Sequence, residues 1–381
     1  MNRLIRRYAS VALVILSVVL LCVFLKTRGT LEDLTEAGKC PACFGTSLCP
    51  DAEEGRLRLW GRSSASLLPA SLLSATLLNV RNVYWGVWTV QDSFRGDKDM
   101  PVVFKKLAHD SELRELDRRI CQAANMSSDC DVSTAGTRLS HSLDGDWDWD
   151  RGLSLVKALA GPTRSSDPSP LACPSRRLLT SMRTLFLGLA QEPLGLPLLL
   201  LLALNPEPIL LEMMNEDPGG HVPHVFGYCG RVVVVEDAGD PLSGFLRSDW
   251  GTRAGLAVQL LDLARRLSPA VDGFAVYLMD LGYDNFLVAE GRLRLADVEH
   301  VVVVDTAVPP DHVGKETWET EHKSDPDLCD GCLGFRPEDL CSHRSSDHNF
   351  YAVCSVSPFL MSISRVVRRN DSSHQSEDKH K

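Results

Sequence analysis

The sequence lacks an excess of basic residues. Its 40 lysines and arginines are outnumbered by 50 aspartates and glutamates, and the formal net charge is −10. Nucleic-acid-binding domains usually carry a basic total or a basic patch, so no nucleic acid is expected as a partner. Hydrophobic residues, in contrast, make up 44% of the 381 residues. This is enough to build a core, and it predicts one large folded domain or two ordinary ones.

A cleavage site is also missing from the N-terminal hydrophobic segment. Residues 9–25 are apolar apart from two serines and have basic residues on both sides, but no small-x-small site follows Leu25. A run of about 17 residues is near the lower limit for spanning a bilayer, whereas a cleavable signal peptide needs such a site. We favour an uncleaved type II membrane anchor within residues 1–29, with a cleaved signal peptide or a buried helix as alternatives. The first two interpretations place the rest of the chain in the secretory-pathway lumen or outside the cell.

A second uninterrupted hydrophobic run of membrane-spanning length is absent. Residues 198–204 are strongly apolar, but Gln191, Glu192 and Pro197 interrupt the stretch around them. The remaining length is too short to cross a bilayer. We expect a buried helix at this position.

Cysteine is plentiful, which agrees with an oxidising compartment. Eleven of the 12 cysteines follow the hydrophobic segment, and clustered cysteines in secreted proteins usually form disulfides. The pairs at 40/43 and 329/332 also have the spacing of a split zinc site or a thioredoxin-like redox pair. Disulfides are favoured because the lumen oxidises thiolates; the odd number leaves one thiol free, paired between chains or without its partner. Sequons at Asn125 and Asn370 predict glycosylation, with Asn125 as the candidate site in the folded region.

Composition and periodicity divide the remainder of the chain into four regions. Residues 30–78 are predicted to be a cysteine-bearing linker, residues 361–381 a disordered tail, and the folded part divides into 79–235 and 236–360. The stretch 122–175 is rich in Ser, Asp, Gly and Pro and is predicted to be a long surface insertion. The expected strands are 101–107, 209–213, 225–229 and 231–236, and the expected helices are 111–121, 176–190 and 252–267.

One stretch carries the spacing of a phosphoryl-transfer site. Asp280 and Asn285 are five residues apart, as in H-R-D-x-x-x-x-N, and Asp297 follows a short strand where a metal-binding Asp belongs. Such chemistry needs a carboxylate to orient the accepting hydroxyl, and an Asn and an Asp to hold metal ions. Lys105 ends a strand whose pattern matches V-A-I-K, and Glu112 or Glu115 on the following helix is the expected partner of this lysine.

Several motifs carry a resemblance to a known family. They are Cys-Pro-Ala-Cys-Phe-Gly-Thr-Ser at 40–47, Asn-Pro-Glu-Pro at 205–208, Gly-Tyr-Cys-Gly-Arg at 227–231, Asp-Asn-Phe at 284–286 and Asp-His-Asn-Phe-Tyr-Ala-Val-Cys at 347–354. Together they resemble the divergent protein kinase domain 2 family, also called the deleted-in-autism family, from about residue 38 to 354.

The resemblance implies an α+β, divergent bilobal protein-kinase-like fold with disulfides, with 79–235 as the N-lobe-like region and 236–360 as the C-lobe-like region. It also implies a Golgi or secretory-pathway protein with ATP and Mg²⁺ or Mn²⁺ as cofactors if active. Lys105, supported by Glu112, would hold the nucleotide phosphates, Asp280 would be the catalytic aspartate, and Asn285 with Asp297 would hold the metal.

Departures from the kinase pattern bear on activity. Leu278 and Met279 replace the His and Arg before Asp280, Val298 and Glu299 replace Phe-Gly, and no Gly-rich loop precedes Lys105. A pseudokinase acting as a secreted or Golgi signalling or scaffold protein is therefore the first hypothesis, with a protein partner or receptor in the lumen or extracellular space and membrane contact through residues 9–25. An active atypical lumenal kinase and a disulfide-stabilised protein of unrelated fold are the alternatives.

Overall fold

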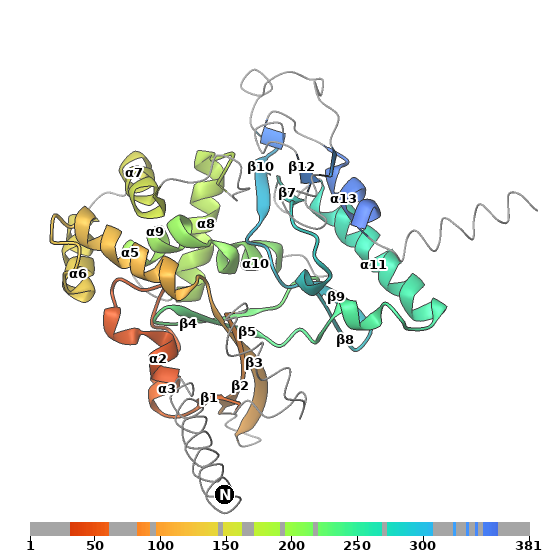
Figure 1. The fold of residues 1–381 in the computed structure, drawn as a ribbon, viewed down its shortest axis with the longest axis horizontal. Coiled ribbons are helices and arrows are strands. Elements are labelled where there is room, and N and C mark those ends of the chain that lie inside the picture. The colour runs from red at the N-terminus through yellow and green to blue at the C-terminus, as the bar shows by residue number, and fades with distance from the viewer. Residues whose placement is uncertain are drawn as a thin grey trace, which may run out of the picture.

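The computed structural model contains mixed helix and sheet (Figure 1). It describes residues 31–60, 82–91, 97–143, 148–161, 171–190, 195–215, 220–268, 273–307, 323–324, 333–334, 340–341 and 346–356. The predicted anchor within 1–29 and the predicted tail at 361–381 lie outside the described residues. Within the described ranges, the predicted site residues Lys105, Asp280, Asn285 and Asp297 lie in or next to the ends of strands, whereas Glu112 lies in a helix.

A five-stranded antiparallel sheet forms the first part of the structure. Its order is β1-β2-β3-β5-β4, with β1 at Leu57–Leu59, β2 at Val83–Val90, β3 at Lys98–Lys106, β4 at Val225–Cys229 and β5 at Val232–Glu236. The central strands are rich in valine, which favours a pleated, buried surface. The expected strands at 101–107, 225–229 and 231–236 are thus confirmed. In this register Lys105 lies between Val83 of β2 and Val233 of β5.

The segment predicted as a linker is instead part of the fold up to residue 60. It forms α2 (Leu31–Thr35), the short helix η1 (Ala37–Lys39), α3 (Cys49–Glu53) and strand β1. Phe44 is fully buried, and Leu48 packs under the sheet with valines of β3 and β5. The prediction was wrong because this segment has no clear periodicity, and its attachment depends on contacts made far along the chain.

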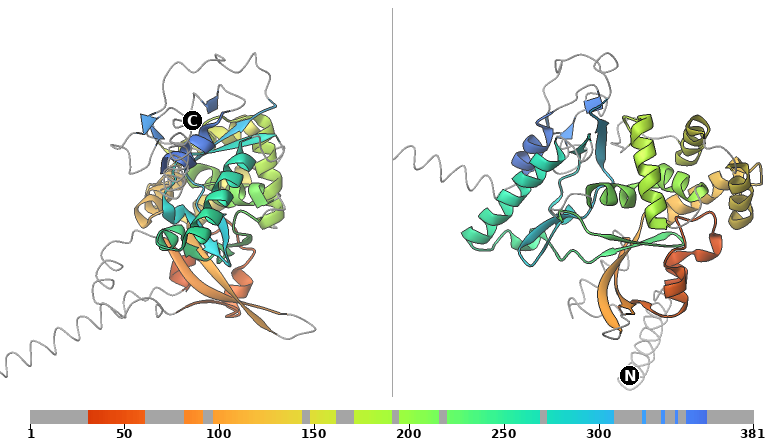
Figure 2. Two further views of the ribbon diagram at one scale, coloured as in Figure 1. Left: turned by 90° about the vertical axis from the view of Figure 1, so that its right-hand side faces the viewer. Right: turned by 180° about the vertical axis from the view of Figure 1, so that it is seen from behind.

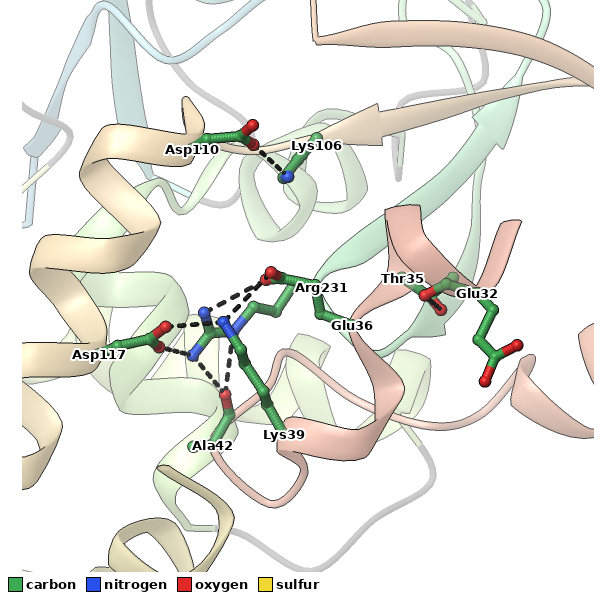
Figure 3. A network of polar contacts seen from close by, with 9 residues as sticks. All are labelled: Glu32, Thr35, Glu36, Lys39, Ala42, Lys106, Asp110, Asp117 and Arg231. Carbon is green, nitrogen blue, oxygen red and sulfur yellow. Dashed lines mark hydrogen bonds and ion pairs between the residues drawn. The ribbon is translucent and has the colours of Figure 1, made fainter. Parts of the chain in front are cut away.

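A buried arginine holds this segment in place (Figure 3). Arg231 follows β4, and its side chain is fully buried. It donates two hydrogen bonds to the Ala42 carbonyl, at 3.1 and 3.2 Å, and pairs with Asp117 and with Glu36 at 3.4 Å. Lys39 joins the same two carboxylates, at 2.7 Å from Asp117 and 3.1 Å from Glu36. The network therefore joins the first helices and the sheet to helix α5 (Asp110–Ala123), which carries Asp117.

Helices between β3 and β4 make up one side of the molecule (Figures 1 and 2). They are α5 (Asp110–Ala123), α6 (Val132–Leu143), α7 (Trp149–Ala160), α8 (Arg176–Ala190), α9 (Leu196–Leu204) and α10 (Glu207–Asn215). The expected helices at 111–121 and 176–190 are confirmed. The stretch 122–175, predicted as a surface insertion, instead contains α6 and α7, which bury Leu139 and Leu159 in the main core.

Helix α10 replaces the strand predicted at 209–213. The side chain of Asn205 accepts a hydrogen bond from the backbone N–H of Glu207, at 2.9 Å. An asparagine that accepts a bond from the first turn of a helix stabilises its start, and prolines at 206 and 208 suit the same region. The short apolar run that follows is therefore helical.

The second part of the structure follows β5. It contains β6 (Asp240–Pro241), η2 (Leu242–Phe245), α11 (Trp250–Leu267), β7 (Phe274–Leu278), η3 (Tyr283–Asn285), β8 (Phe286–Ala289), β9 (Arg292–Leu295), β10 (Val301–Asp305), β11 (Lys323–Ser324), β12 (Leu333–Gly334) and α13 (His348–Val356). β7 pairs with β10, β11 pairs with β12, and β6, β8 and β9 form a small antiparallel sheet. The helix predicted at 252–267 is confirmed as α11.

Four disulfides confirm the expected chemistry of the cysteines. The bonds are Cys40–Cys43, Cys49–Cys229, Cys121–Cys130 and Cys173–Cys341. The bond within the first pair contradicts a zinc site at those two residues, because its thiolates are consumed. Residues 329 and 332 lie outside the described part of the chain. Among the cysteines that the structure describes, Cys354 on α13 is free and exposed.

The apolar helix α9 belongs to the core. Its residues 196 to 201 are buried, as the interrupted sequence predicted. Among the described residues, no single helix has the length and hydrophobicity needed to cross a membrane; only α9 and α10 taken together pass that test, and they are bent by 95°.

Candidate functional site

Lys105 enters the site from the inner strand β3. The side chain is 14% exposed, pairs with Glu207 and donates a hydrogen bond to the backbone carbonyl of Ala296 at 3.0 Å. The Glu207 side chain is only 4% exposed. One lysine thus joins the sheet, helix α10 and the segment that carries Asp297.

The predicted partner of this lysine was wrong. Glu112 instead accepts a hydrogen bond from the backbone N–H of His109, at 2.7 Å, in the capping box of α5. Glu115 pairs with two arginines of its own helix. Both carboxylates are engaged in local helix stabilisation, which short spacing favours. The lysine's actual partner, Glu207, lies 102 residues away in the sequence.

One sequence motif could have identified Glu207 as the partner of Lys105. This residue belongs to the Asn-Pro-Glu-Pro motif and lies at the start of the helix immediately before the β4–β5 hairpin. In protein kinases the strand lysine pairs with a glutamate of the helix called αC. Here the glutamate comes from helix α10. Along the chain, helices α5 to α9 separate α10 from β3, although the two are in contact in the structure.

Asn285 and Asp297 are brought together by the hairpin of β8 and β9. The backbone N–H of Ala296 donates to the Asn285 carbonyl at 2.8 Å, which extends the ladder of the two strands. Asp297 follows directly, and its Oδ1 accepts a hydrogen bond from the Glu299 N–H at 3.2 Å. These two predicted residues therefore lie at one end of the hairpin, beside the lysine that reaches Ala296.

Asp280 lies beside Asn285. Its Oδ1 accepts from the Gly282 N–H at 3.0 Å, and its backbone carbonyl accepts from Asn285 Nδ2 at 3.4 Å. A Cβ atom at Gly282 would lie 3.6 Å from Asp280 Oδ1 and 3.7 Å from the Asn285 amide. The Met279 N–H also donates to the His300 carbonyl at 3.1 Å. The turn holding Asp280 and the segment after Asp297 are thus neighbours.

The site has more acidic than basic groups. Burial raises the pKa of Glu207 to about 7 despite the opposing effect of Lys105, and Asp297 adds to the rise. Burial acts to lower the pKa of Lys105, but Glu207 and Asp297 outweigh burial and raise it. Burial and Asp297 likewise raise the pKa of Glu299. All three shifts favour bound protons, as expected where carboxylates outnumber the ammonium group.

The types of donor atom on Asn285 and Asp297 are those that would suit a metal ion held jointly with phosphate oxygens. Within the described ranges, no group of three or more His, Cys, Asp or Glu side chains is arranged to hold a metal. Mg²⁺ commonly uses one or two protein carboxylates and completes its coordination with water and substrate phosphates. Asn285 and Asp297 offer this small number of oxygen ligands. A nucleotide would supply the remainder.

Three of the four residues that depart from the kinase pattern are packed into the core; the fourth, Glu299, has a side chain that is 42% exposed. Leu278 is 1% exposed, Met279 is 5% exposed, and Val298, in the position of the Phe of Asp-Phe-Gly, is 1% exposed. Apolar burial of this kind contributes about 1.5–3 kcal/mol per large side chain. These positions therefore stabilise the turns around Asp280 and Asp297.

The glycosylation candidate lies far from these residues in the sequence, after the end of α5. Asn125 is exposed, and it lies in the short loop closed by the disulfide between Cys121 and Cys130. An exposed sequon in a loop is sterically open to modification. Its glycosylation stays a prediction.

Comparison with known proteins places these features in a family. A family model described as the protein-kinase domain of FAM69 matches residues 199–374. Divergent protein kinase domain 2A of Xenopus tropicalis is 33% identical over 352 residues, which cover 88% of this chain and 77% of that protein. The Homo sapiens protein of the same name is also 33% identical, over 86% of this chain and 75% of its own length.

More distant similarity extends to a second group. Divergent protein kinase domain 2B of Homo sapiens is 28% identical over 70% of this chain and 60% of its own length. A solved complex of Rv3197 with erythromycin from Mycobacterium tuberculosis aligns over 78% of this chain and 67% of that one at 12% identity, with a TM-score of 0.29, which is too low to indicate a shared fold. The sequence matches suffice: the chain belongs to the divergent protein kinase domain 2 family.

Proposed function

We propose that this protein is an atypical kinase of the secretory pathway that binds ATP with Mg²⁺ or Mn²⁺ and transfers phosphate to a secretory-pathway substrate. The observation that carries the proposal is the contact of Lys105 with both Glu207 and the residue preceding Asp297. Phosphoryl transfer requires positioning and charge stabilisation more than covalent help from the protein. The lysine–glutamate pair and the metal-binding aspartate are the two elements that must be assembled for it.

Each residue has a role in this proposal. Lys105 would contact the nucleotide phosphates, Asn285 and Asp297 would bind the metal that neutralises them, and Asp280 would accept the proton of the attacking hydroxyl. The hydroxyl oxygen forms a bond to the terminal phosphorus as the bond to the leaving ADP oxygen breaks. The two lobes of a kinase would correspond to the five-stranded sheet with α10 and to the part after β5.

Several independent features support the proposed location in the secretory pathway. Four disulfides are present in the described residues, and such bonds persist mainly in oxidising compartments. Asn125 offers an exposed sequon, and the hydrophobic sequence of residues 9–25 is typical of an anchor or signal. We propose a Golgi or secreted protein, in contact with the membrane through residues 9–25 if the segment is retained.

A pseudokinase that acts as a signalling or scaffold protein is the second candidate. In protein kinases a Gly-rich loop between the first two strands covers the phosphates. The corresponding residues 61–81, between β1 and β2, contain one glycine, Gly61. Gly86 of β2 has a packing role, because a Cβ there would lie 2.3 Å from the Arg58 carbonyl oxygen. In this case the partner is a protein or receptor in the lumen or extracellular space.

Thermal stability with and without nucleotide tests binding. The purified chain is heated with ATP and Mg²⁺ or Mn²⁺, and Asp297→Asn is compared with Asp129→Asn, the same change at an exposed aspartate in the loop after α5. A ligand that binds only the folded state raises its stability, so saturable stabilisation is expected in the parent and in Asp129→Asn but not in Asp297→Asn. Absence of stabilisation in the parent at millimolar nucleotide would reject nucleotide binding and favour the scaffold function.

Transfer is tested separately from binding. Labelled phosphate from ATP is followed into lumenal proteins with the parent and with Asp280→Asn. Loss of incorporation in a variant that still binds nucleotide is expected of a kinase. Binding without incorporation in the parent would leave the pseudokinase function.

A further inference from the structure

Asn205 connects two elements of the site that are far apart in sequence. It lies in the bend between α9 and α10 and is 5% exposed. Its Oδ1 accepts from the Glu207 N–H at 2.9 Å, and its Nδ2 donates to Glu299 Oε2 at 2.9 Å. A longer bond, at 3.4 Å, joins the same Nδ2 to the Leu107 carbonyl at the end of β3. The amide therefore uses both its oxygen and its nitrogen between helix α10 and the Asp297 segment.

Glu299 completes the connection from the other side. Its backbone N–H donates to Asp297 Oδ1 at 3.2 Å, while its side chain accepts from Asn205. One residue thus contacts the metal-binding aspartate through the main chain and the start of α10 through the side chain. The position is the one that a glycine holds in Asp-Phe-Gly, and a glycine has no side chain with which to make this contact.

We propose that Asn205 and Glu299 form a clasp that holds Glu207 and Asp297 in their working positions before nucleotide binds. The inference rests on the proposed nucleotide site and adds two positioning residues to it. Protein kinases must bring the lysine–glutamate pair and the metal-binding aspartate into place together, and they control this through the position of αC and through the activation loop. Here a side-chain hydrogen bond between those two elements sets the geometry within the fold itself.

The chemistry of the pair allows a donor and acceptor exchange. Asn205→Asp keeps an oxygen to cap Glu207, but it replaces the amide donor with a carboxylate that faces Glu299. Glu299→Gln in the same chain supplies a new donor, so Asn205→Asp with Glu299→Gln restores the bond with reversed polarity. Asn215→Asp is the matched control, because it makes the same change at the opposite end of α10.

The expected result is a loss and recovery of affinity. Loss of a hydrogen bond to a charged group weakens binding by a factor on the order of ten, so Asn205→Asp should bind ATP with Mg²⁺ about tenfold more weakly than the parent. The double variant should recover most of the affinity, and Asn215→Asp should match the parent. Binding is measured by titration of each purified full chain. Equal affinity of Asn205→Asp and parent, or loss without recovery in the double variant, would overturn the clasp while leaving nucleotide binding intact.

Amide hydrogen exchange without nucleotide separates the clasp from the proposed function. Peptides that cover residues 203–208 and 296–300 should exchange faster in Asn205→Asp and return to the parent rate in the double variant. If the parent binds no nucleotide, hydrogen exchange still tests the clasp. Unchanged exchange in Asn205→Asp overturns the clasp, and faster exchange that returns to the parent rate in the double variant supports it. Should Asn205→Asp fail to fold, Glu299→Ala removes the acceptor from a side chain that is 42% exposed, and the same faster exchange is expected.

Discussion

Replacing Glu207 by glutamine tests whether burial outweighs the attraction of Lys105. In the folded protein the pKa of Glu207 is raised from 4.5 to about 7, chiefly by burial. The folded state therefore holds this proton more tightly than the unfolded state. The stabilisation from this group is fully present below the unfolded pKa and is lost as the pH rises through about 7. Glutamine keeps the shape of the side chain but does not titrate, so the variant lacks this loss.

The expected change in the free energy of unfolding follows from the pKa shift of Glu207. Each pKa unit corresponds to about 1.4 kcal/mol, and the rise from 4.5 to about 7 therefore corresponds to about 3 kcal/mol. The free energy of unfolding of Glu207→Gln, relative to the parent, should improve by about this amount between pH of about 5 and pH of about 8. Urea unfolding at several pH values measures the difference by linear extrapolation.

Glu115→Gln is the matched control for this experiment. The hydrogen bond from Arg118 is the main cause that lowers the pKa of Glu115 to about 2, which lies below the pH window. The difference between Glu115→Gln and the parent should therefore stay constant. If the attraction of Lys105 dominated instead, Glu207→Gln would lose stability relative to the parent as the pH rises, and that slope would refute the reasoning.

Three further predictions concern the rest of the fold. Arg231→Met should lower the free energy of unfolding by about 3 kcal/mol, because Asp117 keeps only the partly exposed Lys39 as a partner and the Ala42 carbonyl loses two hydrogen bonds; urea unfolding measures this, and a change below about 1 kcal/mol would contradict it. Cys49→Ser should cost about 2–5 kcal/mol, because its bond to Cys229 closes a long loop, and the loss should vanish when parent and variant are compared after reduction. Asn125→Gln should reduce the mobility shift that a glycosidase produces in protein expressed through the secretory pathway, even if Asn370 carries a second glycan, and an unchanged shift would show that Asn125 is not glycosylated.

The sequence predicted that most of the candidate site residues lie near one another, because their spacing reflects local structure. Asp280, Asn285 and Asp297 lie within two turns joined by short strands, so their separations along the chain fix their arrangement in space. Lys105 was found for the same reason, since it ends a strand with a recognisable pattern. Glu207 was missed because helices α5 to α9 separate it from β3, and no local rule extends across such an insertion.

The prediction of secondary structure from the sequence was wrong where the same residue types favour both loops and helix starts. Ser and Asp in 122–175 indicated a loop, but Asp131 and Asp148 accept hydrogen bonds from the first turns of α6 and α7. Residues that favour turns also favour helix starts. The apolar run at 209–213 was similarly ambiguous, because short apolar segments fit either a strand or a buried helix.

The excess of acidic groups at the proposed site bears on the form in which a nucleotide would bind. Glu207, Asp297 and Glu299 surround a single lysine, and the resulting pKa shifts favour bound protons. The Coulomb energy of placing nucleotide phosphates among these carboxylates is unfavourable unless a cation enters with them. A divalent metal at Asn285 and Asp297 would supply that charge and lower the pKa of the neighbouring carboxyl groups. We therefore expect the proposed site to bind a metal-bound nucleotide rather than the free nucleotide.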